Sequence, residues 1–370
     1  MCAWSAAISP CPPASRHSPC PRRWPTGWPN TRERSMSPTE RPFTLGLLAL
    51  DGALASSLTG PMDMLRIASK LVQLRQPAAP PRFTTVLVGA RGEATMTDAG
   101  GLQLGPVRSP DQALDLLLVP GYMHSSARDA ADRLAGYGPE QELLRALSLR
   151  GVPLAANCCG SLLLAEAGLL DGRRATTSWW LDGVFRTRYP RVSLDVQQMV
   201  VEDDGITTTG ASTAVMTWLL QLLARIADPA LAQHAARMML IDPDRQSQAP
   251  YISHALAERP RHSLLEKADG FLQRELHREL SIAELAAHCG TSERSLLRHF
   301  RQHHGATPLA HLQHLRVERA KALLETTLLS FDEIVERCGY SDASSFRKLF
   351  KRATSLTPAD YRERFRLRAH

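Results

Sequence analysis

Hydrophobic positions follow two different periods in two regions of the chain. Between residues 43 and 160, apolar runs of strand length alternate with stretches of helical periodicity. The pattern predicts parallel strands at FTLGLLAL (43–50), FTTVLVGA (83–90), LDLLLVPG (114–121) and VPLAANCCG (152–160), and helices near 58–75, 139–149, 161–169 and 211–227. Such alternation is typical of an α/β domain in which helices cover both faces of a parallel sheet.

From residue 263 onward the pattern is helical, and it occurs twice. IAELAAHCG (282–290) and FDEIVERCG (331–339) are amphipathic helices that end in Cys-Gly. Their partners FRQHHGATPLAHL and FKRATSLTPADYR recur at a spacing one residue larger, so the second copy has a longer turn. Ser292 and Asp342 are suitable N-caps for the second helix of each copy. The sequence predicts two helix-turn-helix units joined by a long helix over about 309–324.

The net charge of +7 is unevenly distributed, and residues 1–42 carry six Lys and Arg against two Asp and Glu. Residues 263–370 carry 18 Lys and Arg against 14 Asp and Glu, whereas residues 43–262 carry 20 against 21. The second helices of the two units hold seven of these cations: Arg294, Arg298, Arg301, Arg347, Lys348, Lys351 and Arg352. A helix of this kind enters the major groove of DNA, where Arg reads guanine and other cations bind phosphate. The alternative is a helical bundle with solvated basic faces.

The segment CGYSDASSFRKLFKRATSLTPADYR (338–362) resembles the signature of the AraC/XylS transcription regulators, with similarity over about 264–365. The resemblance implies base-facing positions at Arg294, Leu297 and Arg298 in the first unit and at Ser344, Arg347 and Lys348 in the second. Ser295, Arg301 and Lys351 complete the predicted DNA-binding set. Leu297 departs from a polar reader, because an apolar side chain contacts a thymine methyl but reads no donor or acceptor.

The turn Asn157-Cys158-Cys159-Gly160 lies between a predicted strand and a predicted helix. Such a turn lifts one side chain to a helix N-terminus, where the helix dipole favours a thiolate. The carboxyl ends of the neighbouring strands carry Asp51-Gly52 and the segment 121–124. In sheets of this kind ligands bind beyond the carboxyl ends of the strands, so these segments are expected to converge on one pocket.

Residues 43–235, including AGLLDGRRATTSWW (167–180), resemble the PfpI-like branch of the class I glutamine amidotransferase fold. The resemblance implies Cys158 at the elbow and Gly121 in an oxyanion-binding loop whose amide acts with that of Cys159. Enzymatic relatives place a His directly after the cysteine or about 20 residues on, where this chain has Cys159 and Ser178. Their acidic residue corresponds to Ser57 here.

A working thiol nucleophile needs a base and a group that orients the base. Because residues 126–232 contain no histidine, the sequence predicts a pocket without catalytic residues that binds a small molecule. The pocket candidates are Cys158, Cys159, Gly121, Ser57, Asp63, Ser178 and Trp179. One of Trp179 and Trp180 is expected in the core, while the other walls the pocket or encloses a cationic ligand. The resemblance implies an amino-acid-like or quaternary-ammonium effector.

Several rival hypotheses stay open. A cysteine-dependent hydrolase or glyoxalase-like enzyme fused to a DNA-binding domain is the main one, with His124 or Asp63 assisting Cys158. A redox sensor is another hypothesis, because Cys158 and Cys159 are adjacent and oxidation could modify them. A purely structural dimerisation domain and a ligand-independent architectural DNA-binding protein are further alternatives. The pair His299 and His303 has metal-compatible spacing, although exposed or phosphate-facing imidazoles are the favoured interpretation.

The sequence thus predicts an α/β fold: a parallel-sheet, flavodoxin-like and PfpI-like sensor and dimerisation domain (43–240), a linker (241–262), and an all-α domain with two helix-turn-helix units (263–367).

Residues 1–42, rich in Pro, Arg and Ser, predict a disordered extension, with Met36 an alternative start. The seven cysteines suggest no disulfide framework, which favours the cytoplasm. Expected partners are double-stranded DNA, a small effector, a second copy of the chain and RNA polymerase, with no cofactor, metal or membrane.

Overall fold

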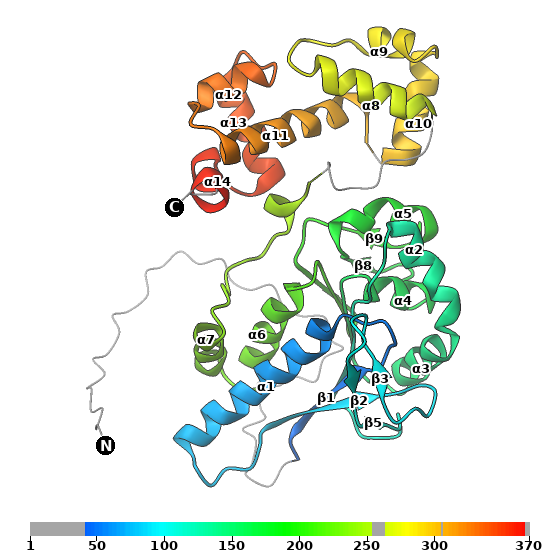
Figure 1. Ribbon diagram of the computed structural model, residues 1–370, viewed down its shortest axis with the longest axis vertical. Coiled ribbons are helices and arrows are strands. Elements are labelled where there is room, and N and C mark those ends of the chain that lie inside the picture. The colour runs from blue at the N-terminus through cyan, green and yellow to red at the C-terminus, as the bar shows by residue number, and fades with distance from the viewer. Residues whose placement is uncertain (1–40, 254–262, 305, 367–370) are drawn as a thin grey trace, which may run out of the picture.

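The computed structural model describes residues 41–253, 263–304 and 306–366. Figure 1 shows an α/β part and, above it, a part built from helices. Nearly all of the predicted N-terminal extension lies outside the described residues. None of the helices in the described ranges combines the length and the apolar character that crossing a membrane would require.

The α/β part is organised around a seven-stranded sheet. Its strands run in the order β10-β11-β7-β6-β1-β2-β5, and all neighbours are parallel except β10 and β11. The strands are β1 (Phe43–Leu48), β2 (Phe83–Val88), β5 (Val107–Arg108), β6 (Leu116–Val119), β7 (Leu154–Asn157), β10 (Val200–Asp203) and β11 (Ile206–Thr209). The four predicted strands are therefore confirmed, and they form the adjacent centre of the sheet.

Two short two-stranded sheets complete the β structure. One pairs β3 (Met96–Thr97) with β4 (Gln103–Leu104), and the other pairs β8 (Arg174–Ala175) with β9 (Ser193–Leu194).

Helices cover both faces of the large sheet, as the alternating pattern predicted. Helices α1 (Ala55–Arg75), α6 (Ala214–Ile226) and α7 (Pro229–Met238) pack together on one face, and α2 (Ala127–Asp132), α3 (Gly138–Leu149), α4 (Gly160–Glu166) and α5 (Asp182–Arg188) lie across the sheet from them (Figure 1). Short 3₁₀ turns occur at η2 (Arg133–Gly136) and η3 (Trp179–Leu181). Burial of the central strands, such as Leu45, Leu117 and Ala155 at 0 % exposure, explains their uninterrupted apolar runs.

Strand β11 was not predicted, because its sequence, ITTT, is mostly polar. Its three threonines are nevertheless buried. The hydroxyl of Thr209 donates to the Asn157 side-chain oxygen at 3.1 Å, and that of Thr208 accepts from the Thr176 amide at 2.8 Å. Hydrogen bonds therefore offset the cost of burying the hydroxyls of Thr208 and Thr209, whereas the buried Thr207 hydroxyl has no hydrogen-bond partner among the described residues.

The helical part contains the two predicted helix-turn-helix units. Its helices are α8 (Ser263–Glu275), α9 (Ile282–His288), α10 (Glu293–His304), α11 (Pro308–Thr326), α12 (Phe331–Arg337), α13 (Ala343–Thr354) and α14 (Pro358–Phe365). Each unit has its own apolar core, and α11 supplies Leu312 and Leu315 to the first and Leu323 and Leu324 to the second. The connecting helix is thus a shared wall of both cores.

The helix starts follow the chemistry that the sequence predicted. The Ser292 hydroxyl accepts from the Ser295 amide at 3.3 Å, and the Asp342 carboxylate accepts from the amides of Ser344 and Ser345. Gly290 and Gly339 close α9 and α12 with φ of 64° and 74°, a conformation that favours glycine. A hydrogen bond from the Ser345 side chain lowers the pKa of Asp342 most, and the bonds from the amides of Ser344 and Ser345 lower it further.

The expected linker begins as a packed segment, which corrects the simple picture of a polar connector. Gln248, Ala249 and Pro250 are buried around the 3₁₀ turn η4 (Ala249–Tyr251). The remainder of the expected linker, 254–262, lies outside the described residues. We refer to residues 245–252 as the strap.

Candidate functional site

The elbow is a strained turn between β7 and α4, as expected for a residue lifted out of a strand. Cys158 has a φ of 56°, and its amide lies 3.1 Å from the carbonyl oxygens of both Thr209 and Gly210. A Cβ at Gly160 would lie 2.6 Å from the Pro120 carbonyl oxygen, so only glycine fits as β6 passes. The turn therefore depends on β6 and β11 on either side of β7.

The Cys158 thiol is surrounded by hydrogen-bond donors. The hydroxyl of Ser178 donates to its sulfur at 2.8 Å. The pKa of Cys158 is lowered to about 7, chiefly by a hydrogen bond from the Cys159 thiol and further by Ser178 and the amides of Cys159 and Ser212, while burial opposes the shift. These donors stabilise a thiolate, but a donor is not a proton acceptor.

Cys159 has the opposite character. Its sulfur lies 3.1 Å from both the amide nitrogen and the carbonyl oxygen of Tyr122, on the loop after β6. A thiol has one proton, so Cys159 donates either to Tyr122 or to Cys158. Burial raises the pKa of Cys159 well above its ordinary value, so this cysteine stays protonated.

Among the described residues, His124 forms its hydrogen bonds with Tyr122 and Trp180. Its Nδ1 lies 3.0 Å from the Tyr122 carbonyl oxygen, and its Nε2 accepts from the Trp180 indole at 3.2 Å. This pair of contacts fits one neutral tautomer, with the proton on Nδ1 and the lone pair of Nε2 occupied. The imidazole is thus engaged elsewhere, and Ser178 occupies the place beside the thiol.

Gly121 and Ser57 do lie at the elbow, where sequence comparison had placed them. A Cβ on Gly121 would lie 3.0 Å from the Cys158 Cβ and 3.5 Å from the Ser57 hydroxyl. Ser57 is buried, and its oxygen accepts from the Asn157 side-chain amide at 3.2 Å. At the position where enzymatic relatives carry an acid, the structure has a neutral group bonded to another neutral group.

Asp63 is a correction to the predicted pocket. It is exposed on α1, and no hydrogen bond or ion pair joins it to the described elbow residues. Six residues separate it from Ser57, which turns its side chain about 120° around the helix axis from the buried face. The sequence places Asp63 near the predicted start of the helix, but the face of α1 on which its side chain lies determines whether it can reach the elbow.

Both tryptophans are half-buried in η3, and their rings meet edge to face with centroids 5.2 Å apart. Trp180 packs against the apolar core of the α/β part, as expected for one member of the pair. We refer to Trp179 and Trp180 as the rim. Trp179 directly follows Ser178, while Trp180 holds His124, so the pair connects the elbow to the loop after β6.

Sequence reasoning missed Gln248, which is the most highly bonded side chain near the elbow. Its Nε2 lies 3.0 Å from each of the carbonyl oxygens of Thr177, Val196 and Gln198, which share its two N–H groups, and its Oε1 accepts from the Ala211 amide at 2.8 Å. Gly210 leaves room for it, since a Cβ there would lie 2.2 Å from the Gln248 side chain. Nothing in the polar sequence of the strap signalled this burial.

The other end of the strap contacts the second helix-turn-helix unit. The Tyr251 ring packs against Phe365 of α14 with centroids 5.2 Å apart, and the buried Lys321 of α11 donates to the Ile252 carbonyl. Asp242, just before the strap, pairs with Arg364 at 3.7 Å. Gln248, which lies near the elbow, is thus three positions before Tyr251, which contacts the DNA-binding part.

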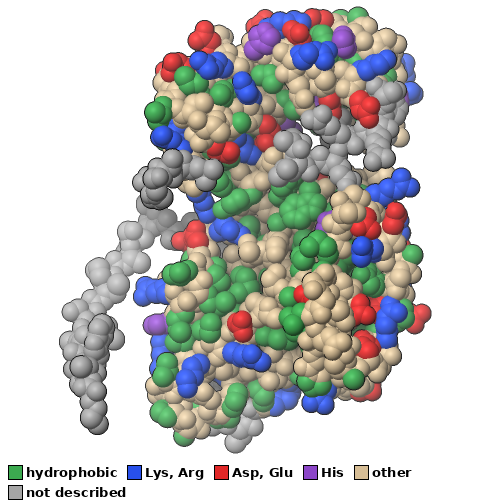
Figure 2. Space-filling model, in the orientation of Figure 1, with side chains coloured by type: hydrophobic (Ala, Val, Ile, Leu, Met, Phe, Trp, Pro, Cys, Tyr) green, Lys and Arg blue, Asp and Glu red, His purple; other side chains and the backbone are tan. Residues whose placement is uncertain are grey.

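The predicted reading residues of the first unit lie on one surface. A hollow of about 840 Å³ is lined by Ser292, Arg294, Ser295, Leu297, Arg298, Arg301 and Gln302, which includes all five predicted residues. Arg294, Arg298 and Arg301 are exposed at spacings of four and three residues, so they form one stripe along α10. Figure 2 shows Asp and Glu between the cations of the helical part, so charge alone does not mark this face.

In the second unit, Ser344, Arg347, Lys348 and Lys351 are all exposed on α13, and the apolar stripe Phe346, Leu349 and Phe350 is buried. The guanidinium of Arg347 lies 5.0 Å from the Phe331 ring centroid, which limits its freedom. Cys289 and Cys338, which end the two repeated helices, are core residues, and burial raises the pKa of Cys338 to about 12.

The metal hypothesis gains no support from the described residues, among which no group of three or more His, Cys, Asp or Glu could hold an ion. The side chain of His303 lies outside the described set, so its spacing to His299 stays untested.

Two exposed basic helices, each the second of a helix-turn-helix unit, define the class of protein as a transcription regulator that binds DNA. Comparison with known proteins gives the family. Residues 285–364 match a helix-turn-helix domain family, and residues 46–225 match the DJ-1/PfpI family. The chain belongs to the HTH-type transcriptional regulators that join a DJ-1/PfpI domain to an AraC-type DNA-binding domain.

Several relatives are similar over more than half of this chain. The regulator GlxA of Rhizobium meliloti is 30 % identical over 281 residues, which cover 74 % of this chain and 84 % of the relative. The regulator GbdR of Pseudomonas aeruginosa is 26 % identical over 328 residues, covering 87 % and 84 %. The regulator CdhR of the same organism is 31 % identical over 229 residues, covering 61 % and 67 %.

Solved structures match each part separately. An AraC family regulator from Pseudomonas putida is 21 % identical, covers 54 % of this chain and 100 % of that one, and has a TM-score of 0.44. The DNA-binding domain of AdpA, solved with a target DNA, is 35 % identical, covers 28 % and 92 %, and has a TM-score of 0.27.

Proposed function

We propose that this DNA-binding regulator is controlled by a small molecule that binds its DJ-1/PfpI domain beside the elbow. The carrying observation is that this domain keeps a thiol with a lowered pKa at the elbow, while Ser178 stands in the place of the base. The site retains hydrogen-bond donors suited to an anionic or polar group, without the machinery for proton transfer. A cytoplasmic location and a homodimer belong to the same proposal.

The rim suggests the chemical class of the effector. Trp179 and Trp180 are half-buried, and an aromatic pair of this kind attracts a cation or an apolar group. An amino-acid-like or quaternary-ammonium metabolite carries such a cation. Because the elbow residues themselves are buried, its entry requires movement of the rim.

The strap supplies a route from this site to DNA. Gln248 bonds the carbonyl of Thr177, whose own hydroxyl donates to the Cys158 carbonyl at 3.2 Å. A ligand that shifts the turn therefore shifts Gln248, and with it Tyr251 against Phe365. Differential affinity of the ligand for two positions of the strap would change the placement of the second unit.

A thermal-shift screen of amino acids and quaternary-ammonium compounds tests this function. A ligand at 100 times its Kd adds about 2.7 kcal/mol to the free energy of unfolding, so even weak binders register at millimolar concentration. The shift should disappear in Cys158→Trp, which fills the elbow, and persist in Ser125→Ala, an exposed change after the loop. If neither class of compound stabilises the wild-type protein, the proposed effector class is wrong.

A second candidate function is an enzymatic one, because a thiol pKa of about 7 gives a thiolate at neutral pH. A hydrolase or glyoxalase-like activity would require Cys158-dependent turnover of small amide or dicarbonyl substrates. We expect no turnover above the Cys158→Ser control. Turnover that vanishes in this variant would replace the sensor hypothesis.

A further inference from the structure

The two reading helices belong to different apolar cores, so something must fix their relative position. Helix α11 contributes to both cores and so connects the units, and a second contact between them would further restrict rotation of one unit against the other. The structure contains a direct contact between the units at the middle of α11. It involves Arg316, the loop after α8 and the turn after α12.

Arg316 is buried, at 8 % exposure, although it carries a full charge. Its Nε donates to the Leu276 carbonyl at 2.9 Å and its Nη2 to the Arg278 carbonyl at 2.6 Å, both in the loop after α8. On the other side, its guanidinium lies 5.0 Å from the ring centroid of Tyr340 in the second unit. One side chain of the connecting helix therefore holds a segment of each unit.

The two copies of the repeat differ at this contact. A Cβ on Gly290 in the first unit would meet nothing within 4 Å. A Cβ on Gly339 in the second unit would lie 2.5 Å from the Leu276 carbonyl oxygen and 2.9 Å from Arg316 Nη2. The longer turn of the second copy, which contains Tyr340, is thus the one that packs against the first unit.

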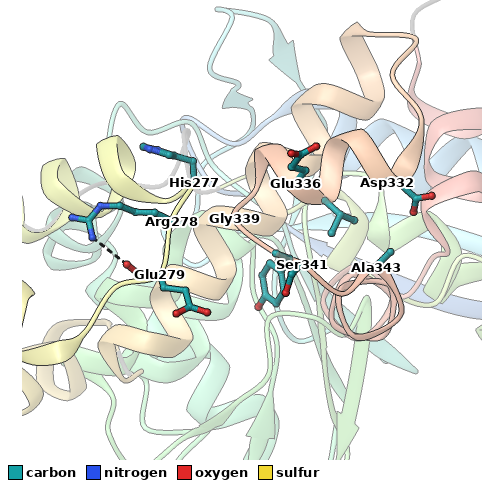
Figure 3. Close-up of a pocket in the computed structure, with 10 residues that line it drawn as sticks. His277, Arg278, Glu279, Asp332, Glu336, Gly339, Ser341 and Ala343 are labelled. Carbon is teal, nitrogen blue, oxygen red and sulfur yellow. Dashed lines mark hydrogen bonds between the residues drawn. The ribbon is translucent and has the colours of Figure 1, made fainter.

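The loop that receives this contact is itself fixed to the first unit. Arg278 bonds Glu275 of α8 at 2.7 Å and also bonds Glu284 of α9. Figure 3 shows this loop, with His277, Arg278 and Glu279, facing the turn at Gly339 and Ser341 across a cavity of about 600 Å³. The wall of the cavity is therefore made by both units, and Gly339 is one of the residues that line it.

We propose that Arg316, Tyr340 and Gly339 form a joint that fixes the separation and angle of α10 and α13, and so sets the spacing between the two base-contacting sub-sites that one chain accepts. Arg316 is a positioning residue in this proposal. Its side chain lies away from the stripe on α10 and acts through the loop and the turn that it holds. The joint does not depend on the effector hypothesis, since it lies wholly within the DNA-binding part.

Spacing variants of the DNA test the joint. The full-length protein is used to select its site from a pool of random duplexes, and one to three base pairs are then inserted between the two sub-sites. Each inserted base pair rotates the second sub-site by about 35° around the duplex, so a rigid pair of units loses one contact set. For the wild type we expect each insertion to weaken binding at least tenfold. For Arg316→Met, the loss should fall below threefold.

The matched control is Arg319→Met, which removes an exposed cation from the same helix and should keep the wild-type penalty. Tyr340→Leu should relax spacing as Arg316→Met does, whereas Tyr340→Phe retains the ring and should behave as wild type. These variants also cover the case in which Arg316→Met fails to fold. A wild type that tolerates insertions, or an undiminished penalty in folded Arg316→Met and Tyr340→Leu, would overturn the proposal.

Discussion

At the scale of single residues, the elbow holds a thiol with a lowered pKa, and the described groups that hydrogen-bond its sulfur are donors. Cys158 resembles a nucleophile in backbone strain and in its lowered pKa. Ser178 donates a hydrogen bond to the thiol, Ser57 accepts one from the Asn157 side-chain amide, and His124 accepts one from the Trp180 indole. The bond from Ser178 stabilises negative charge on the Cys158 sulfur.

This environment predicts a specific titration. Ser178→Ala removes one donor to the thiolate, and a hydrogen bond to a charged group contributes about 1.5–3 kcal/mol, so the pKa of Cys158 should rise by about one unit or more. The midpoint is measured from the pH dependence of thiolate absorbance, with Cys158→Ser as the blank. Ser161→Ala is the matched control, because its hydroxyl bonds the Cys158 carbonyl and not the sulfur. An unmoved midpoint in Ser178→Ala would contradict the assignment.

The same pKa has a consequence for stability. A thiol whose pKa is about 7 in the folded chain and near 9 when unfolded binds fewer protons in the folded state between these values. Its contribution is therefore complete above pH 9 and lost as the pH falls through 7. Comparing urea unfolding of wild type and Cys158→Ser at pH 6 and pH 9 should show a larger stability difference at pH 9.

At the scale of elements, the reading helices present their predicted residues outward. Arg298 lies in the centre of the stripe on α10, between Arg294 and Arg301. Arg298→Ala should weaken binding to the selected site by about 1–3 kcal/mol and change binding to random DNA much less. Arg337→Ala, an exposed cation on α12, is the control for lost charge alone. Equal losses on specific and random DNA would reduce Arg298 to a phosphate contact.

The repeated glycines give a stability prediction for the same elements. Ala at either position is strained, since both glycines have positive φ, and this strain costs about 1–2 kcal/mol. Gly339→Ala also forces a Cβ against the Leu276 carbonyl, whereas Gly290→Ala meets open space. Urea unfolding of the two variants should therefore show a clearly greater loss for Gly339→Ala. Equal losses would mean that the contact between the units is weak.

The elements themselves were largely predictable, because period and length separate buried strands from amphipathic helices. The strands at β1, β2, β6 and β7 and both helix-turn-helix units follow from these signals. Strand β11 did not, since buried threonines imitate a loop until their hydrogen-bond partners are known. The elbow followed from the turn sequence, but Gln248 and Arg316 did not, because their roles depend on carbonyl groups that no sequence pattern displays.

At the scale of the whole molecule, the strap joins the two parts through short-range contacts. Gln248 is held by backbone groups of the α/β part, and Tyr251 and Ile252 contact α14 and α11. Under the proposed control by an effector, a displacement at the elbow would reach the second unit through the strap, and the first unit through α11 and the proposed joint at Arg316. Helix α5 of the α/β part also contacts α10 directly.

This arrangement predicts that damage to one end of the strap is felt at the other. In Gln248→Ala the buried carbonyls lose their donor, the strap loosens, and hydrogen exchange of peptides from α14 should increase severalfold. Gln246→Ala, an exposed neighbour, should leave exchange of α14 unchanged. An increase confined to peptides of the α/β part would separate the two parts and leave the effector without this route.

One chain is expected to bind duplex DNA with two reading helices, α10 and α13, that are held at a fixed separation. Selection of binding sites from random duplexes by the purified full-length protein tests it most directly. We predict two enriched sub-sites per chain at a constant separation of about one helical turn, since the major groove returns every 34–36 Å. A single sub-site, or two whose separation varies freely, would contradict the claim.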